Sequence, residues 1–125
     1  MTGWTTDELQ TIATADELEI SSFLREGAAG GWTTIWVVRV GDDLFVRSVR
    51  GPAGGWYRDT QVRREGRIRA GDVEKDVSFV EGDPDLEGRI DDAYREKYRR
   101  YARSTVESVL TPDARSATLE LVPRG

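Results

Sequence analysis

One stretch of the chain concentrates residue types that bind anions. Arg47 and Arg50 lie in the apolar run LFVRSVR, with Ser48 between them, and the aromatic pair Trp56 and Tyr57 follows. A guanidinium on an apolar strand usually pairs with a carboxylate or a phosphate, and the serine hydroxyl adds a hydrogen-bond donor. These residues therefore favour an anion-binding site. An internal ion pair between an arginine and one of the many Asp and Glu residues explains the pattern equally well.

The spacing of Arg47 and Ser48 limits how one ligand can reach both. Successive side chains of a strand point to opposite faces of the sheet, so these two neighbours should diverge. A single ligand can contact both only where the strand ends or carries a bulge. The combined site thus depends on where this strand stops.

Residue types that the sequence lacks exclude several other chemistries. The chain has no Cys and no His, which excludes a thiolate nucleophile, a Ser-His-Asp triad and a His-based zinc site. The acidic residues in 83–92 lack the spacing of a calcium-binding loop, so no metal is expected. A carboxylate pair among Glu65, Glu74 and Asp76 is disfavoured, because these residues fall at a helix end and in an exposed hairpin. No catalytic residue can be assigned; carboxylates, Arg, Tyr or a cofactor must carry any reaction.

The net charge and the hydropathy of the sequence limit the classes of binding partner. A formal net charge of −5 over 125 residues argues against a general nucleic-acid binder. No apolar run is long enough to cross a bilayer and no signal peptide is visible, so no membrane association and a cytoplasmic location are expected. The whole chain, 1–125, is expected to form one domain. Residues 123–125 receive no functional weight, because LVPRG matches the remnant of a thrombin-cleavable tag, although it could equally be native.

The element that must position the arginines is a predicted hairpin. The β-rich runs 33–40 and 44–50 flank Gly41-Asp42-Asp43, where the glycine suits a tight turn. In the first arm Trp36 and Val38 point one way and Val37 the other, so both faces are apolar. The second face must meet a partner subunit, a packing helix or a flat ligand.

The flanking elements mix helices and strands, which indicates an α+β fold around an antiparallel sheet. Thr5 and Glu8 form a capping box that begins the first helix. The remaining expected elements are a strand at 17–24, a flexible glycine-rich link at 25–31, a helix at 56–66 ending at Gly66, a hairpin around Gly71-Asp72, a long helix from Asp83-Pro84 through YREKYRRYAR, a short helix at Thr111-Pro112 and a strand at 117–122 that closes the sheet.

The long helix carries an apolar stripe and a basic end. Ile90, Tyr94, Tyr98 and Tyr101 share one helical face, for which core packing is the default expectation. The run YREKYRRYAR follows an acidic opening, the polarity that the helix dipole favours. A solvated structural face is therefore the preferred interpretation, with anion binding as the alternative.

The sequence around the hairpin also resembles a known family. TIWVVRVGDDLFVRSVRGPAGGWYR, followed by GRIRAGDVEKDVSFV, is similar to the bacterial domain-of-unknown-function family 2255. That family resembles the FMN-binding split-barrel superfamily, which includes pyridoxamine-phosphate-oxidase-like proteins and the deazaflavin-dependent nitroreductases and quinone reductases. GPAGGWYR is similar to the glycine-rich loop and Pro-x-Trp-Tyr helix start of the deazaflavin group.

The resemblance implies a six-stranded antiparallel split β-barrel with peripheral helices. It also implies a homodimer that holds FMN or a deazaflavin coenzyme in a groove at the subunit interface. The cofactor-binding candidates are Arg47, Ser48, Arg50, Trp56 and Tyr57. The expected function is that of an oxidoreductase acting on a small organic molecule.

One departure from the family pattern keeps an alternative open. The deazaflavin proteins carry a Gly-Arg-x-Ser-Gly-like loop before the first hairpin arm, whereas this chain has EGAAGGWTT. The alternative is a cofactor-free protein that binds a small molecule in the same groove, as a biosynthetic accessory protein or as a cyclase or isomerase.

Overall fold

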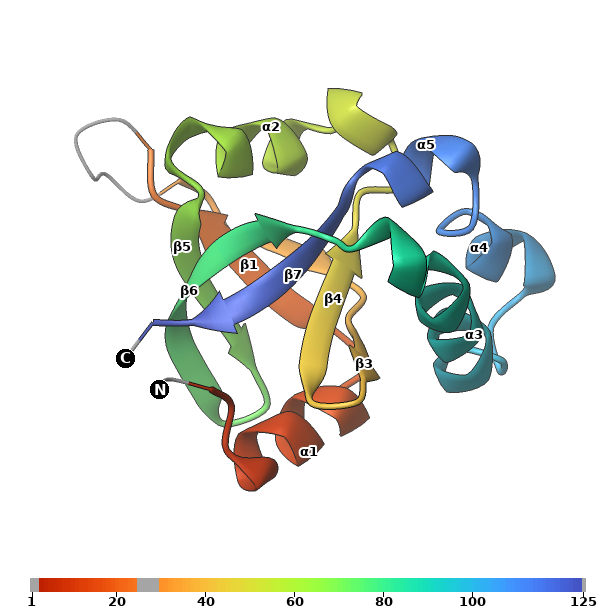
Figure 1. The fold of residues 1–125 in the computed structure, drawn as a ribbon, viewed down its shortest axis with the longest axis horizontal. Helices are drawn as coiled ribbons and strands as arrows, with labels where there is room; N and C mark the ends of the chain where they lie inside the picture. Colours follow the sequence, from red (N-terminus) through yellow and green to blue (C-terminus); the bar gives the residue numbers. More distant parts are fainter. Residues whose placement is uncertain (1–2, 25–29, 125) are drawn as a thin grey trace.

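The computed structural model describes residues 3–24 and 30–124 and shows an α+β fold (Figure 1). The predicted link at 25–31 falls largely outside the described residues, as does Gly125. The strands are β1 Leu18–Ser22, β2 Thr33–Ile35, β3 Val38–Val40, β4 Asp43–Arg47, β5 Glu65–Ala70, β6 Val73–Glu81 and β7 Thr118–Pro123. The α-helices are α1 Thr6–Thr14, α2 Gly55–Arg63, α3 Glu87–Lys97, α4 Arg103–Glu107 and α5 Pro112–Ser116, with short 3-10 helices η2 Gly51–Ala53 and η3 Pro84–Leu86.

The sheet order brings two sequence neighbours to opposite edges. The order is β2-β1-β5-β6-β7-β4-β3, and every pairing is antiparallel. Only Trp36 and Val37 separate β2 from β3, and three residue steps span at most about 10 Å. The two edges must therefore approach each other, and the sheet curls into a half-barrel.

The predicted number of six strands was wrong, because one predicted strand is divided in two. The predicted first hairpin arm, 33–40, is two strands: β2 pairs with β1, and β3 pairs with β4. The arm breaks because β2 and β3 form the two opposite edges of the curled sheet, and each pairs with a different neighbouring strand. The described residues therefore form seven strands.

Both predicted hairpin turns are present. Gly41 and Gly71 have positive φ angles of 62° and 59°, a conformation that glycine adopts without strain. Val40 pairs with Asp43 and Ala70 with Val73, so each loop has two residues. β7 is a strand as expected and lies between β6 and β4, where it joins the two hairpins into one sheet.

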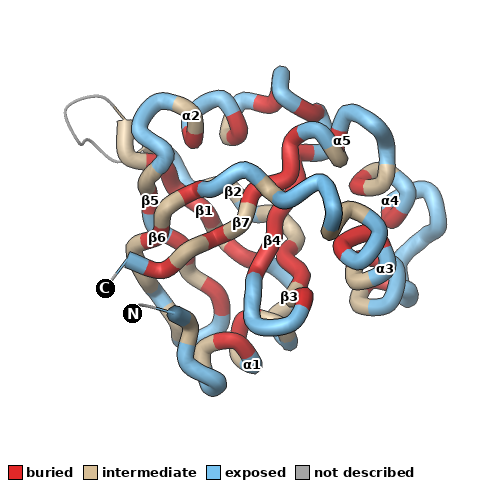
Figure 2. Tube along the Cα trace, in the orientation of Figure 1, coloured by how far each residue is buried: buried red, intermediate tan, exposed pale blue. Residues whose placement is uncertain are grey.

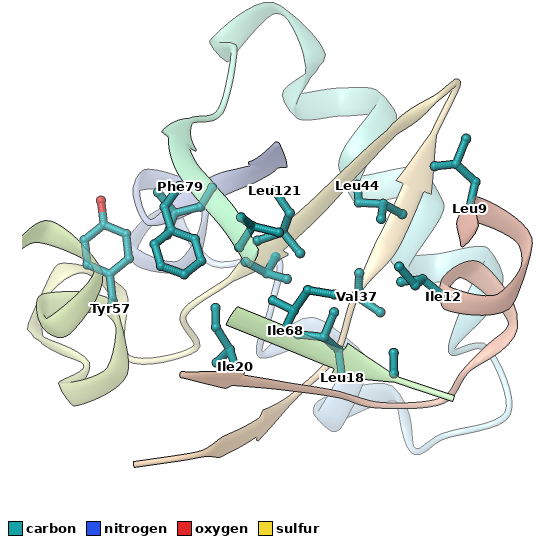
Figure 3. Close-up of a cluster of buried hydrophobic side chains, with 14 of the residues drawn as sticks. Leu9, Ile12, Leu18, Ile20, Val37, Leu44, Tyr57, Ile68, Phe79 and Leu121 are labelled. Carbon is teal, nitrogen blue, oxygen red and sulfur yellow. The ribbon is translucent and has the colours of Figure 1, made fainter. Parts of the chain in front are cut away.

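The two apolar faces of the first arm enter two separate cores. Figure 2 shows the buried stretches along the strands. Val37 belongs to the core inside the half-barrel, which also contains Leu44, Phe79 and Leu121 (Figure 3). Val38 packs on the outer face with residues of α3 and α4. Of the three proposed occupants of the second face, a packing helix is therefore the one observed.

Two helix ends differ from the expectation. α2 ends at Arg63, and Arg64 takes the left-handed cap conformation with φ 58°, so Gly66 is not the terminator. Gly66 lies in β5, where a Cβ atom would clash with the Ser21 carbonyl and the Phe79 ring. The long helix stops at Lys97 and does not run through YREKYRRYAR.

The other local predictions hold. The capping box of Thr5 and Glu8 is present, and Thr111 caps α5. Asp83-Pro84 does begin helical structure, although the first turn is η3 and α3 starts at Glu87. The basic run makes exposed ion pairs, which supports a solvated face; they are Arg95–Asp92, Arg99–Glu96, Arg100–Asp16 and Arg103–Glu107.

Three residues of the apolar stripe are buried in the core on the outer face of the half-barrel, which we call the outer core: Ile90, Tyr94 and Tyr98. Tyr101 is exposed. Among the residues that the structure describes, none of the helices has both the length and the apolar character needed to cross a membrane.

Candidate functional site

A cavity of about 370 Å³ lies where β2, β4 and α2 meet, and we call it the α2 cavity. Its walls are Thr33, Thr34, Ile35, Trp36, Arg47, Ser48, Val49, Arg50, Gly54, Gly55, Trp56, Thr105, Ser108 and Val109. Four of the five residues predicted from the sequence are among them, namely Arg47, Ser48, Arg50 and Trp56. The fifth, Tyr57, is buried in the inner core beside Phe79 (Figure 3).

The lining of the α2 cavity is unusual for an acidic protein. Among the residues that the structure describes, it contains two arginines and no Asp or Glu, although the chain has 23 acidic residues. Two tryptophans and three aliphatic side chains form its apolar part. Such a lining suits an anionic ligand with an apolar or aromatic body.

Arg47 itself is held by an internal ion pair. Its side chain has 0 % exposure and contacts the carboxylate of Asp91, which is also buried. Its Nε donates to the Thr118 hydroxyl at 2.9 Å and its Nη1 to the Val109 carbonyl at 3.0 Å. The other carboxylate oxygen of Asp91 accepts from Arg115 at 2.8 Å. The ion-pair explanation for this arginine is therefore correct, and most of its donors are engaged.

Ser48 lies just past the end of β4, which stops at Arg47. This is the strand end that a shared ligand required, and both residues line the cavity. Ser48 has 1 % exposure, yet its hydroxyl makes no hydrogen bond within the described parts of the chain. The hydrogen-bonding capacity of the Ser48 hydroxyl is therefore available to a ligand. The fully buried side-chain atoms that lack a partner in the described residues lie elsewhere: they are the Tyr94 hydroxyl and Arg115 Nε.

Gly54 is required for this arrangement. A Cβ atom at Gly54 would clash with the Ser48 Oγ, so only glycine lets the start of α2 approach the hydroxyl. Gly54 is also the N-cap of α2, and no side chain caps this helix. The first-turn N–H groups of an uncapped helix attract anions through their partial positive charge.

Arg50 completes the electropositive end of the cavity. It is exposed, lines the cavity and belongs to none of the ion pairs found among the described residues. The uncapped start of α2 lies against the Ser48 hydroxyl and the Arg50 side chain, and all three line the cavity. We call this group the anion end.

Trp36 and Trp56 form the aromatic part of the lining, which we call the aromatic wall; the sequence did not single out Trp36 as a site residue. Trp36 stacks on Tyr98 with ring centroids 3.9 Å apart and an interplanar angle of 5°. The sequence placed Trp36 only on one apolar face of the first arm; its place in the cavity depends on the break between β2 and β3, which long-range strand pairing decides. Thr33, Thr34, Thr105 and Ser108 were missed for the same reason.

The break between β2 and β3 is held by the end of α3. The Tyr98 hydroxyl accepts from the Val37 N–H at 3.2 Å and donates to the Asp16 carbonyl at 2.8 Å. Lys97 Nζ donates to the Val37 carbonyl at 2.6 Å. Burial lowers the pKa of Lys97 to about 8 and raises the pKa of Tyr98 above its ordinary value. These contacts replace the ladder hydrogen bonds that Val37 lacks.

A second cavity, which we call the α5 cavity, also has a volume of about 370 Å³. It is lined by Arg47, Glu81, Gly82, Asp83, Pro84, Glu87, Ile90, Pro112, Arg115, Ser116 and Thr118. Arg47 thus lines both cavities. The α5 cavity has no aromatic wall, and carboxylates stand beside its arginines.

The family model described as "Uncharacterized protein conserved in bacteria (DUF2255)" matches residues 8–121. No curated protein matches the sequence.

Among solved structures, the heme storage protein HutZ from Vibrio cholerae is similar with a TM-score of 0.62 and 12% identity, over 100% of this chain and 92% of that one. An F420 reductase gives a TM-score of 0.56 at 12% identity, with coverages of 93% and 92%. A FAD-binding protein from Mesorhizobium loti gives 0.58 at 12% identity, with coverages of 98% and 91%. At such identities these likenesses show a shared fold.

Proposed function

The chain belongs to the bacterial family DUF2255, and we propose that it binds a flavin-type cofactor, FMN or a deazaflavin, in the α2 cavity. The observation that carries this proposal is the pairing of an aromatic wall with the anion end in a lining whose described residues include no carboxylate. A flavin nucleotide has the matching shape, a flat ring joined to a phosphate.

The residues present fit such a group. The anion end (Ser48, Arg50 and the first turn of α2) would hold the phosphate, because none of the described residues engages the Ser48 hydroxyl or the Arg50 guanidinium, and both can donate to it. Trp56 lies beside them at the start of α2. The buried Arg47 would contribute positive charge to the cavity, although its ion pair with Asp91 offsets much of this charge.

Bound, this cofactor would supply hydride transfer, which a chain without His and Cys does not easily supply itself. The protein's own residues would bind and orient it and keep water from one face of the ring. We further propose a small organic molecule as the substrate. The similarity to an F420 reductase and a FAD-binding protein supports the same cofactor class.

The assembly expected for this function is a homodimer with the cavity at the subunit interface. Val49 supports it, because this lining residue is 51% exposed in the single chain and a second copy would cover it. Analytical ultracentrifugation tests this expectation: a monomer at micromolar concentration would contradict it.

A cofactor-free small-molecule binding protein is the second candidate. The ion pair between Arg47 and Asp91 favours this candidate, since the arginine at the end of β4 is not free to bind a phosphate. In this case the cavity would bind an aromatic carboxylate or phosphate without redox chemistry.

An absorbance scan of the purified protein, followed by titration with FMN and with F420, separates the two candidates. Tryptophan fluorescence reports the binding, because two of the four tryptophans line the cavity. Saturable binding of either cofactor supports the first candidate. The absence of binding of both up to millimolar concentration would refute it.

A further inference from the structure

The Trp36 side chain is the best-supported flat surface in the α2 cavity. Its ring stacks on Tyr98, whose side chain is fully buried and hydrogen-bonded to Val37 and Asp16. A ring supported in this way loses little conformational entropy when a second ring stacks on it, because it is already ordered.

One face of the Trp36 ring is left uncovered by its aromatic neighbours. Tyr98 covers the first face, in parallel contact at 3.9 Å. Tyr101 lies 5.1 Å from Trp36 and 5.9 Å from Tyr98, which places it roughly at a right angle to the stacking direction. Tyr101 therefore lies at the edge of the Trp36 ring. Neither tyrosine occupies the second face, and Trp36 lines the cavity.

Trp56 is a weaker candidate for the same role. Its ring meets Tyr57 edge-on, with an interplanar angle of 77° and centroids 6.2 Å apart. It packs partly against the inner core and lies next to the uncapped start of α2. Its position suits a contact near the anionic group of a ligand more than a stack on its ring.

We propose that Trp36 is the stacking platform for the planar ring of the ligand and thereby selects conjugated, flat molecules over aliphatic anions. This inference rests on the proposed function, since it assumes a ligand with a ring in the α2 cavity. It adds a division of labour: the anion end binds the charged group, and Trp36 binds the ring.

Riboflavin and FMN separate the two parts of the site, because riboflavin has the ring without the phosphate. In Trp36→Leu, both ligands should bind about five- to tenfold more weakly, the range expected for a lost aromatic stack. Trp36→Phe should restore most of the affinity, since it keeps an aromatic ring. Tyr101→Leu is the matched control: Tyr101 touches the same aromatic cluster but does not line the cavity, so its loss should leave both affinities unchanged.

A fluorescence measurement keeps the test decisive if Trp36→Leu does not fold. Bound riboflavin should quench less of the tryptophan emission in Trp36→Phe than in Trp32→Phe, because Trp32 is not a cavity residue. Equal quenching in both variants, or a folded Trp36→Leu with wild-type affinity for both ligands, overturns the inference. Failure of wild-type protein to bind either ligand instead overturns the proposed function.

Discussion

The α2 cavity and the α5 cavity have the same volume, about 370 Å³ each, and share Arg47, yet their walls differ. Among the described residues, the lining of the α2 cavity combines two tryptophans with two arginines and contains no carboxylate. The lining of the α5 cavity contains carboxylates, and its Arg115 pairs with Glu87 and with the nearby Asp91. The chemistry of the walls, more than the volume, therefore distinguishes the two cavities.

The largest effect is expected from breaking the ion pair between Arg47, which lines both cavities, and Asp91. Asp91→Ala leaves the buried Arg47 and its neighbour Arg115 without their shared carboxylate. Breaking a buried pair in this way should lower the free energy of unfolding by about 3–5 kcal/mol, as measured by urea denaturation. Asp92→Ala is the control, because Asp92 makes only an exposed pair with Arg95 and should cost less than about 1 kcal/mol. Similar losses in the two variants would contradict the role assigned to Asp91.

Closing the gap between α2 and Ser48 would break the α2 cavity alone. In Gly54→Ala the new Cβ clashes with the Ser48 Oγ, so stability should fall by about 1–3 kcal/mol and FMN affinity by at least about tenfold, about 1.4 kcal/mol. Calorimetry and fluorescence titration measure the two effects. Gly88→Ala serves as the reference, since a Cβ there meets nothing within 4 Å. If FMN binding survives Gly54→Ala unchanged, the anion end is not where the phosphate lies.

One arginine from each cavity sharpens the comparison. Arg50→Ala should weaken FMN binding about tenfold, about 1.4 kcal/mol, and leave riboflavin binding unaffected, because Arg50 is the cation of the anion end. Arg115→Ala should leave FMN binding unchanged and lower stability, because Arg115 pairs with Asp91. An FMN affinity that depends on Arg115 and not on Arg50 would reverse the assignment of the two cavities.

The smallest effect concerns Lys97, which lies behind the aromatic wall. Burial lowers its folded-state pKa to about 8 from an ordinary value of 10.5, so between these pH values the unfolded chain binds more protons. Stability should therefore rise with pH in this window, by about 1 kcal/mol or less because the amine is partly exposed. Denaturation at pH 8 and pH 9.5 should show this rise in wild-type protein and not in Lys97→Met. A window below pH 10 avoids Tyr98, whose raised pKa acts in the opposite direction.

Much of the local structure was predictable, because it depends on interactions within a few residues. Thr5 and Glu8 cap α1 through hydrogen bonds three residues apart, and Gly41 and Gly71 supply the positive φ of two-residue turns. The resemblance of the hairpin region to family 2255 is confirmed by the family match. Four of the five predicted site residues line the α2 cavity, since β4 and α2 are close in sequence.

The residues of the sequence were thus sufficient to predict the starts of α1 and α5, the turns, the two apolar faces of the first arm and the residue types of the anion end. Tertiary structure alone decided that this arm splits into β2 and β3, that Arg47 pairs with Asp91, 44 residues away, and that Trp36 stacks on Tyr98. The physical reason is the distance along the sequence between the interacting residues. Caps and turns are stabilised by neighbouring residues, whereas a strand break or a buried ion pair depends on which distant segments the folded sheet brings together.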